Sequence, residues 1–153
     1  LQIVPPGASQ SGQTSAQPPL EELEFTSLQE ALDAYGITEP LAPKWLPEGF
    51  ESRDVIISVD PDFIRIIAVY QCREKEIRVT VRRYNSEEVL EGFLLEKQEW
   101  LQETEYISNH VVHSIFQNVD TYSASWSRGL NVATISGDVT EEELEKIIDS
   151  IYD

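Results

Sequence analysis

The sequence predicts an α+β fold, in which a curved antiparallel sheet of about six to eight strands packs against a C-terminal helix, with a short N-terminal helix. Two observations predict this class. Short runs with a hydrophobic period of two follow one another through the middle of the chain, and two amphipathic runs with capping residues flank them. Because strands and helices do not alternate, we expect no parallel sheet.

The first twenty residues differ in composition from the rest. Residues 1–20 carry no charged side chain and hold four of the eight prolines. Such a segment has too few large side chains to offset the entropy of ordering, which predicts a flexible Pro/Ser/Gln linker. Residues 21–153 have the length of a single domain. The chain begins at Leu1 and has no methionine, so we expect a processed product or a fragment that follows a membrane anchor or another domain.

The domain opens with a helix signal. Ser27 and Glu30 have the spacing of a capping box, apolar residues from Leu28 to Tyr35 keep a helical period, and Gly36 follows as a stop. A helix of about two turns must dock on another element to persist.

The stretch KWLPEGF, residues 44–50, closes a proline-rich loop. Pro47 presets a turn and Gly49 can take a positive φ, so both have structural roles. We predict that Trp45 and Leu46 are buried under the sheet edge, where they would fasten the loop to the core.

Three strands are expected next, at residues 54–60, 63–72 and 76–84. The first and third alternate apolar and polar residues, and the second is apolar on both faces, as in a central strand. Residues 85–105 are ambiguous, since Gly92 interrupts a helical pattern. We expect a short helical turn at 86–91 and a strand near 93–98.

The last third of the chain predicts a meander and a helix. Strands are expected at 110–117, 122–126 and 131–136. Thr140 and Glu143 then form a second capping box, and the apolar residues that follow recur at i, i+3, i+4 and i+7. This stripe needs an apolar surface, which the meander offers.

The charge excludes some classes of partner. With 28 acidic and 11 basic residues, the net charge is −17, which argues against nucleic acid and against anionic membrane surfaces. The single cysteine, Cys72, lies in an apolar run, so it forms no internal disulfide and is expected to be buried.

Catalytic and metal motifs are missing from the sequence. There is no G-x-S-x-G elbow, no metal-ligand spacing and no glycine-rich phosphate loop, so we expect no enzyme activity, no metal and no cofactor. His110 and His113 fall three apart in one predicted strand and would point to opposite faces, which favours structural or surface roles. A hydrolase that uses acids around Glu96 to Glu105 stays open as an alternative.

Two features could contact a ligand or a partner. Six of the eleven basic residues lie between Arg65 and Arg83, and Arg78 and Arg82 share the outward face of one strand. Pairing with acids on neighbouring strands is the simpler interpretation of these arginines. Tyr122 and Trp126 share a face opposite a row of serines, where they could bind a sugar or an apolar ligand, although a core position is simpler.

The order of these pieces resembles a known family. The entry PKWLPEGF, the blocks HSIFQN and ASWSRGLNVATISGD, and the final helix ending in KIIDSIY resemble, over residues 27–152, the bacterial domain-of-unknown-function family 4367. The resemblance implies an extracytoplasmic domain of membrane-anchored proteins of Gram-positive bacteria, some of them like anti-sigma factors. The P-x-W-L-P-E-G-F entry is also similar, more loosely, to domains related to lipoprotein carriers and sigma-regulator sensors.

We therefore expect a non-enzymatic extracytoplasmic sensor or interaction domain, tethered to the cell membrane by an upstream anchor. Its partner would be a protein or a cell-envelope component, and it could regulate a sigma factor. The alternative is a carrier-like module that binds an apolar or lipid ligand between sheet and helix, in a cavity of roughly 300 Å³ or more.

Overall fold

The fold is built on one antiparallel sheet. The structure, a computed structural model, describes residues 24–98 and 104–153. Seven strands pair in the order β1-β2-β3-β7-β6-β5-β4, which confirms the predicted α+β class. The strands are β1 (Glu51–Val59), β2 (Phe63–Cys72), β3 (Lys75–Tyr84), β4 (Thr104–Ser108), β5 (Val111–Gln117), β6 (Tyr122–Arg128) and β7 (Asn131–Gly137). Residues 1–20 lie outside the described ranges, so the linker stays a prediction.

The described residues form the helices α1 (Leu28–Ala34), α2 (Glu87–Gln98) and α3 (Glu141–Ile151). The predicted capping box of α3 is present: the backbone N–H of Glu143 donates to Thr140 Oγ1 (3.1 Å), and the N–H of Thr140 donates to the Glu143 carboxylate (2.9 Å). None of these helices is long and apolar enough to cross a membrane.

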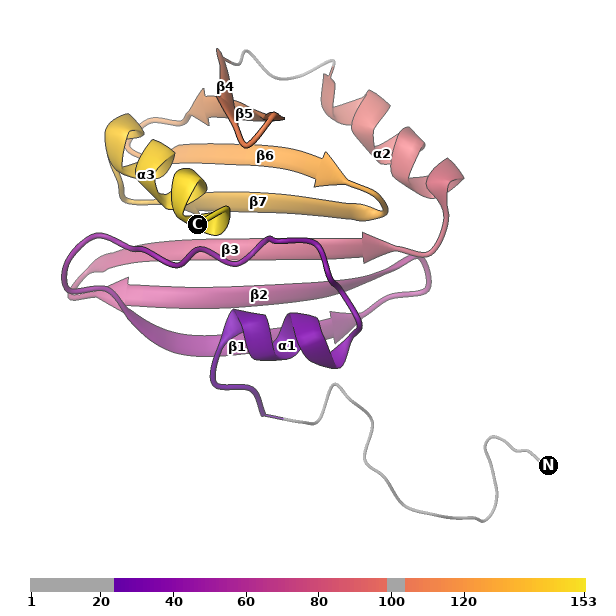
Figure 1. Ribbon diagram of the computed structural model, residues 1–153, viewed down its shortest axis with the longest axis horizontal. Helices are drawn as coiled ribbons and strands as arrows, with labels where there is room; N and C mark the ends of the chain where they lie inside the picture. The colour runs from indigo at the N-terminus through magenta and orange to yellow at the C-terminus, as the bar shows by residue number, and fades with distance from the viewer. Residues whose placement is uncertain (1–23, 99–103) are drawn as a thin grey trace.

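One face of the sheet, the covered face, packs against α1, α3 and the loop between α1 and β1 (Figure 1). Alternation along β3 places Ile77, Val79 and Val81 on this face, where all three are fully buried. The apolar stripe of α3 contacts them and is buried as completely; its members are Leu144, Ile147, Ile148 and Ile151. Burial of about 25 cal/mol per Å² of apolar surface makes this layer the main source of stability.

The loop before β1 is attached to α3 by its backbone. The Oγ of Ser150 accepts hydrogen bonds from the backbone N–H groups of Lys44 (3.0 Å) and Trp45 (3.1 Å). The ammonium group of Lys44 donates to the carbonyl of Ile151 at 2.7 Å. Leu46 packs against the core, whereas the Trp45 side chain is 39% exposed.

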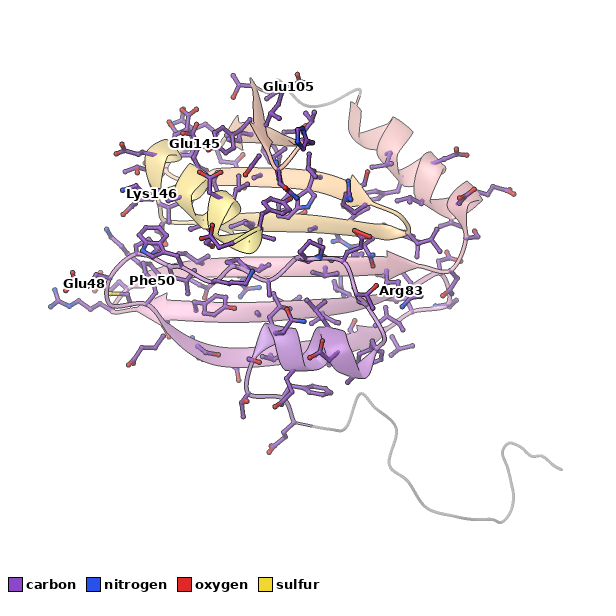
Figure 2. All side chains as sticks on the ribbon, viewed as in Figure 1. Glu48, Phe50, Arg83, Glu105, Glu145 and Lys146 are labelled. Atoms are coloured by element: carbon purple, nitrogen blue, oxygen red, sulfur yellow. The ribbon has the colours of Figure 1, made fainter. Side chains whose placement is uncertain are left out.

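The predicted burial of Trp45 is therefore wrong. The backbone bonds fix the main chain at this point, and the indole then lies outside, with the Nζ of Lys146 5.9 Å from its ring centroid. Figure 2 shows Lys146 on α3. Pro47 is buried, and its carbonyl accepts a bond from the N–H of Phe50 at 3.3 Å. Gly49 has φ +94°, and a Cβ there would lie 2.8 Å from Cys72 Sγ, so the turn favours glycine twice over.

Residues 86–98 correct a second prediction, since one helix replaces the expected turn and strand. Ser86 caps the N-terminus of α2, where its Oγ accepts a bond from the N–H of Val89 at 3.3 Å. Leu90 and Phe93 then pack with Tyr84 and other apolar residues at the end of the sheet. This packing outweighs the roughly 1 kcal/mol that a helical glycine costs at Gly92.

The strand of this region lies later in the chain. β4 pairs with β5 from Thr104↔Ile115 to Ser108↔Val111 and forms one edge of the sheet, opposite β1. The turn after β4 contains His110, which is exposed, so only His113 belongs to β5.

Candidate functional site: the open face of the sheet

The second face of the sheet, the open face, points away from α1 and α3. Its centre is a row of hydroxyl groups: the Oγ of Ser123 donates to Ser136 Oγ at 3.0 Å, and the Oγ of Ser125 lies 3.3 Å from Thr134 Oγ1. Thr80 is the partner of Thr134 and extends this row onto β3. Of the described helices, only α2 packs on this face, at the end that carries Tyr84 and Val132.

Three arginines stand beside the hydroxyl row. Arg65 of β2 and Arg82 of β3 are direct cross-strand partners, and Arg78 pairs with Val69 four residues along the same strands. Arg78 Nε lies 2.5 Å from a carboxylate oxygen of Glu76. Glu76 lies on β3 itself, two residues from Arg78, so this is not the pairing with acids of neighbouring strands that the simpler interpretation of the basic cluster predicts.

Arg65 and Arg82 are held differently. The Cζ of Arg65 lies 6.0 Å from the ring centroid of Phe63, and the Cζ of Arg82 lies 5.9 Å from the same centroid. Arg82 is also 5.7 Å from the centroid of Phe93 on α2. Aromatic faces attract guanidinium groups, by about 0.5–1 kcal/mol at exposed sites. These rings position two cations without neutralising them.

Among the described side chains, which are those of residues 24–94 and 104–153, no carboxylate pairs with either group, and the ion pairs there involve Arg53, Arg78 and Arg128. An Nη of Arg65 donates to Ser58 Oγ at 3.3 Å. The Nε of Arg65 is buried and has no hydrogen-bond partner among the described residues. Two like charges directly opposite one another destabilise a sheet, so this pair is costly as it stands.

An open pocket adjoins the arginine pair at the end of the sheet. It has a volume of about 440 Å³ and lies between α2 and the open face. Its apolar lining includes Phe63, Tyr84, Val89 and Phe93, and Asp62 and Glu88 also line it. Phe63 and Phe93 thus border both the pocket and the Arg82 guanidinium.

The other predicted contact residues lie elsewhere. Tyr122 packs against the core of the covered face and Trp126 is 5% exposed within it. Arg83 points to the covered face, where it donates to the carbonyl of Tyr35 at 3.0 Å. Only Arg78 and Arg82, of the four predicted contact residues, share the open face.

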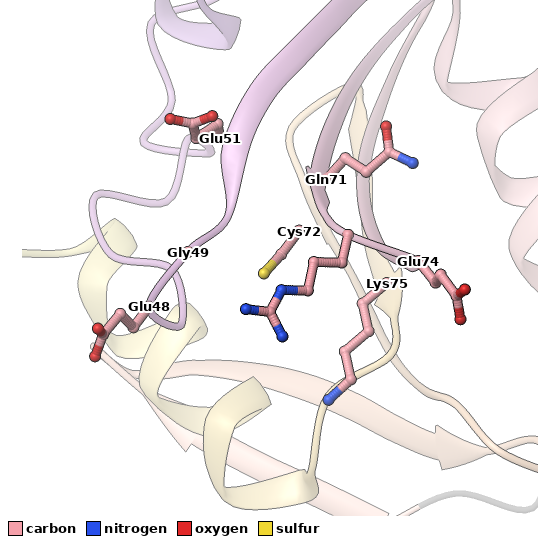
Figure 3. Close-up of a pocket in the computed structure, with 8 residues that line it drawn as sticks. Glu48, Gly49, Glu51, Gln71, Cys72, Glu74 and Lys75 are labelled. Carbon is pink, nitrogen blue, oxygen red and sulfur yellow. The ribbon is translucent and has the colours of Figure 1, made fainter.

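The turn between β2 and β3 borders a larger pocket, of about 800 Å³ (Figure 3). The side chains around it carry opposite charges: Arg73 and Lys75 face Glu48 and Glu51. Cys72 is half-buried at its wall. The mixture of charges gives this pocket no preference for an anion or a cation.

A buried polar network, which sequence reasoning missed, joins β4, β5 and α3. The ring of His113 is fully buried, its centroid 4.6 Å from that of Trp126. Nδ1 donates to the carbonyl of Tyr106 (3.2 Å), because a carbonyl only accepts, and Nε2 accepts from the hydroxyl of Tyr152 (2.7 Å). Burial lowers the pKa of His113 below its usual 6.5, which keeps the ring neutral.

Asp149 anchors the outer end of this network. Its carboxylate accepts from the Tyr106 hydroxyl at 2.9 and 2.8 Å and from Ser108 Oγ at 2.7 Å. Burial, the bond to Asp149 and the charges of Asp149 and Glu145 together raise the pKa of Tyr106 to about 12. These groups are engaged with one another, which suits a structural role.

The hydrolase and carrier alternatives gain no support from the geometry. Glu105 is exposed on β4, residues 99–103 lie outside the described ranges, and the described residues contain no cluster of three potential metal ligands. Between the sheet and α3, the described side chains are fully buried, and the two pockets described above lie outside this layer.

Comparison with known proteins places the chain in a family. The sequence model of a domain of unknown function (DUF4367) matches residues 40–151. The chain belongs to the DUF4367 family. The matched part of this DUF4367 domain runs from the loop before β1 to the end of α3 and so includes both arginines of the pair.

Among solved structures, the crystal structure of MucB in complex with MucA(peri) is similar to this DUF4367 domain, with a TM-score of 0.45 and 15% sequence identity. The likeness covers 74% of this chain and 36% of that one, so the domain spans about a third of the MucB chain. No curated protein matches the sequence.

Proposed function

We propose that this DUF4367 domain is a non-enzymatic interaction domain that binds a protein or cell-envelope component through the open face. The observation that carries the proposal is the asymmetry of the sheet. The helices α1 and α3 and the loop before β1 cover one face, whereas the other presents hydroxyl groups and two guanidinium groups that lack carboxylate partners among the described side chains. Arginine is enriched in binding interfaces because its planar fork recognises carboxylates.

The absence of enzyme activity is part of this proposal. His113 and Tyr106, whose pKa values are shifted, are engaged in bonds that hold β4, β5 and α3 together. A general base needs a free lone pair directed at a substrate, and Nε2 of His113 already accepts from Tyr152.

We further propose that the domain lies outside the cell membrane, tethered by an upstream anchor, and that it regulates a sigma factor. The resemblance of the sequence supports this location and role. An epitope tag after Asp153 of the full-length protein tests the location: external protease should remove the tag from intact protoplasts. A tag that is cleaved only after lysis would contradict the location.

Site-specific photocrosslinking in cells tests the open face. A photoreactive residue at Thr134, in the centre of the open face, should give a discrete adduct of the full-length protein. The same residue at Gln29, on the exposed side of α1, is the matched control and should give none. Equal adducts from both positions, or none from Thr134, would contradict binding through this face.

A further inference from the structure

The arginine pair adjoins the pocket beneath α2, because two residues that line the pocket, Phe63 and Phe93, also contact guanidinium groups of the pair. Phe63 lies under both guanidinium groups and lines the pocket, and Phe93 contacts Arg82 from the α2 side. Arg82 therefore stands at the boundary between a cationic surface and an apolar hollow.

We propose that Arg65, Arg82 and the adjoining pocket form a two-point site for a protein segment that carries an aspartate or glutamate next to a large apolar side chain. The carboxylate pairs with the guanidinium groups, and the apolar side chain enters the pocket. This inference rests on the proposed function, because it names the class of partner that the open face binds.

The distribution of charge on the domain supports a carboxylate on the partner segment. The chain has a net charge of −17, so an anion is repelled over most of the surface and is attracted where cations stand without acids. A carboxylate between Arg65 and Arg82 would relieve their mutual repulsion and supply an acceptor near the buried Nε of Arg65. Bidentate pairing also suits two planar groups held on aromatic faces.

The apolar pocket of the proposed site favours a protein segment over a polyanion as the partner. A volume of about 440 Å³ accommodates an aromatic or branched side chain, and Phe63, Tyr84 and Phe93 offer ring faces to it. A phosphate polymer has no group that would use these surfaces. Asp62 and Glu88 line the pocket and repel a second carboxylate, which favours an uncharged side chain there.

The test is selection from a phage-displayed library of random twelve-residue peptides against the 153-residue chain. Enriched peptides should carry Asp or Glu within two positions of Phe, Tyr, Trp or Leu. Enrichment should fall at least tenfold on R65Q/R82Q and stay unchanged on R53Q/R128Q. The control removes the same charge from exposed arginines away from the site. The R65K/R82K variant keeps both positive charges but lacks the planar guanidinium groups. Peptide enrichment on it should fall by an intermediate amount.

The outcomes separate this inference from the proposed function. Circular dichroism of each variant checks that it is folded, and R65K/R82K serves as the test if the glutamine pair unfolds. Peptides that bind R65Q/R82Q as well as wild type, or that need no apolar residue, overturn the inference. Stronger arginine-dependent binding of sodium polyphosphate than of any peptide overturns it too. If Thr134 still yields its adduct, the proposed function stands and only the partner class is wrong.

Discussion

Ser150 stabilises the end of the chain more than its small size suggests. Its Oγ accepts from two backbone N–H groups of the loop before β1 and donates to the carbonyl of Ile147 at 2.7 Å. Replacing Ser150 with alanine leaves both N–H groups without this partner. We expect Ser150→Ala to lower the free energy of unfolding by about 1–3 kcal/mol in urea titrations. Exposed Ser127→Ala should change it by less than about 0.5 kcal/mol, and equal effects would contradict the role of Ser150.

Two of the three tryptophans, Trp45 and Trp126, should respond differently to truncation. Trp126→Ala removes a nearly buried ring from the core and should cost about 3–5 kcal/mol. Trp45→Ala loses an exposed ring and one cation–π contact, which should cost less than about 1 kcal/mol. Chemical unfolding of both variants measures the difference. A loss above 3 kcal/mol for Trp45→Ala would show that the indole is buried after all.

The sequence explains why Trp45 is hard to place. An aromatic residue between prolines predicts burial from hydrophobicity alone, but its neighbours decide which part of the loop touches the core. Here the partner is Ser150, 105 residues later, which binds the backbone. A short-range pattern contains no signal for such a contact.

At the scale of elements, His113 makes the attachment of α3 to β4 and β5 depend on pH. Its pKa is lowered in the folded state, so the unfolded chain takes up a proton first as the pH falls. The contribution of the neutral His113 ring to the free energy of unfolding is complete above pH 6.5. It is lost as the pH falls from 6.5 to the pKa of the folded state, by at most about 1.4 kcal/mol per pH unit. Protonation would also remove the acceptor that Tyr152 uses.

Carboxylates titrate in the same range of acidity, so a difference between variants isolates the histidine. The stability of wild type relative to His113→Asn should shrink between pH 7.5 and 5.5, when each is unfolded by urea at a series of pH values. Exposed His110→Asn is the control and should track wild type. If the difference in the free energy of unfolding between wild type and His113→Asn stayed the same at every pH, this pH dependence would be refuted.

The pairing of β3 with β7, which is the joint between the two halves of the sheet, requires a residue without a side chain at position 137. Gly137 pairs with Ile77, and a Cβ at residue 137 would lie 2.6 Å from the carbonyl oxygen of Glu76 and 2.9 Å from Ile77 Cα. We expect Gly137→Ala to lower the thermal midpoint, at a cost of about 1–3 kcal/mol. Gly92 of α2 has open space around it, and alanine favours a helix more than glycine does. Gly92→Ala should therefore raise the thermal midpoint, with a gain in stability of up to about 1 kcal/mol. A neutral Gly137→Ala would show that the joint can widen.

Elements with local signals were predictable and the others were not. The capping residues and apolar stripe of α3 lie within one run, and so does the alternation of β3. The helix α2 depends on contacts with Tyr84 and Val132, which no local pattern contains. With Gly92 in its middle, this segment predicts the wrong structure until the sheet is known.

At the scale of the molecule, charge opposes folding. The net charge is −17, and the ion pairs of the described residues are partly exposed, so they contribute little. Salt screens the repulsion between acids more than it weakens such pairs. The thermal midpoint should therefore rise between 20 mM and 500 mM NaCl at pH 7.5. A fall with added NaCl would mean that attractive pairs dominate.

The candidate site was only half predictable. Alternation along β3 places Arg78 and Arg82 on one outward face, and the sequence predicts as much. The partner of Arg82 is Arg65 on another strand, and register decides that they meet. Arg78, by contrast, finds its acid two residues away on the same strand, at Glu76.

The strand order has a consequence for how the chain reaches its native state. β1, β2 and β3 are joined by tight turns, and so are β4, β5, β6 and β7, so each group can form from contacts close in sequence. The groups meet only where β3 pairs with β7, across residues such as Val79 and Ile135. Bringing β7 to β3 closes a long loop of chain, and this costs entropy before the contacts between the two strands can form. Assembly of the two halves is therefore the slow step that we expect in refolding, with Gly137 at the joint.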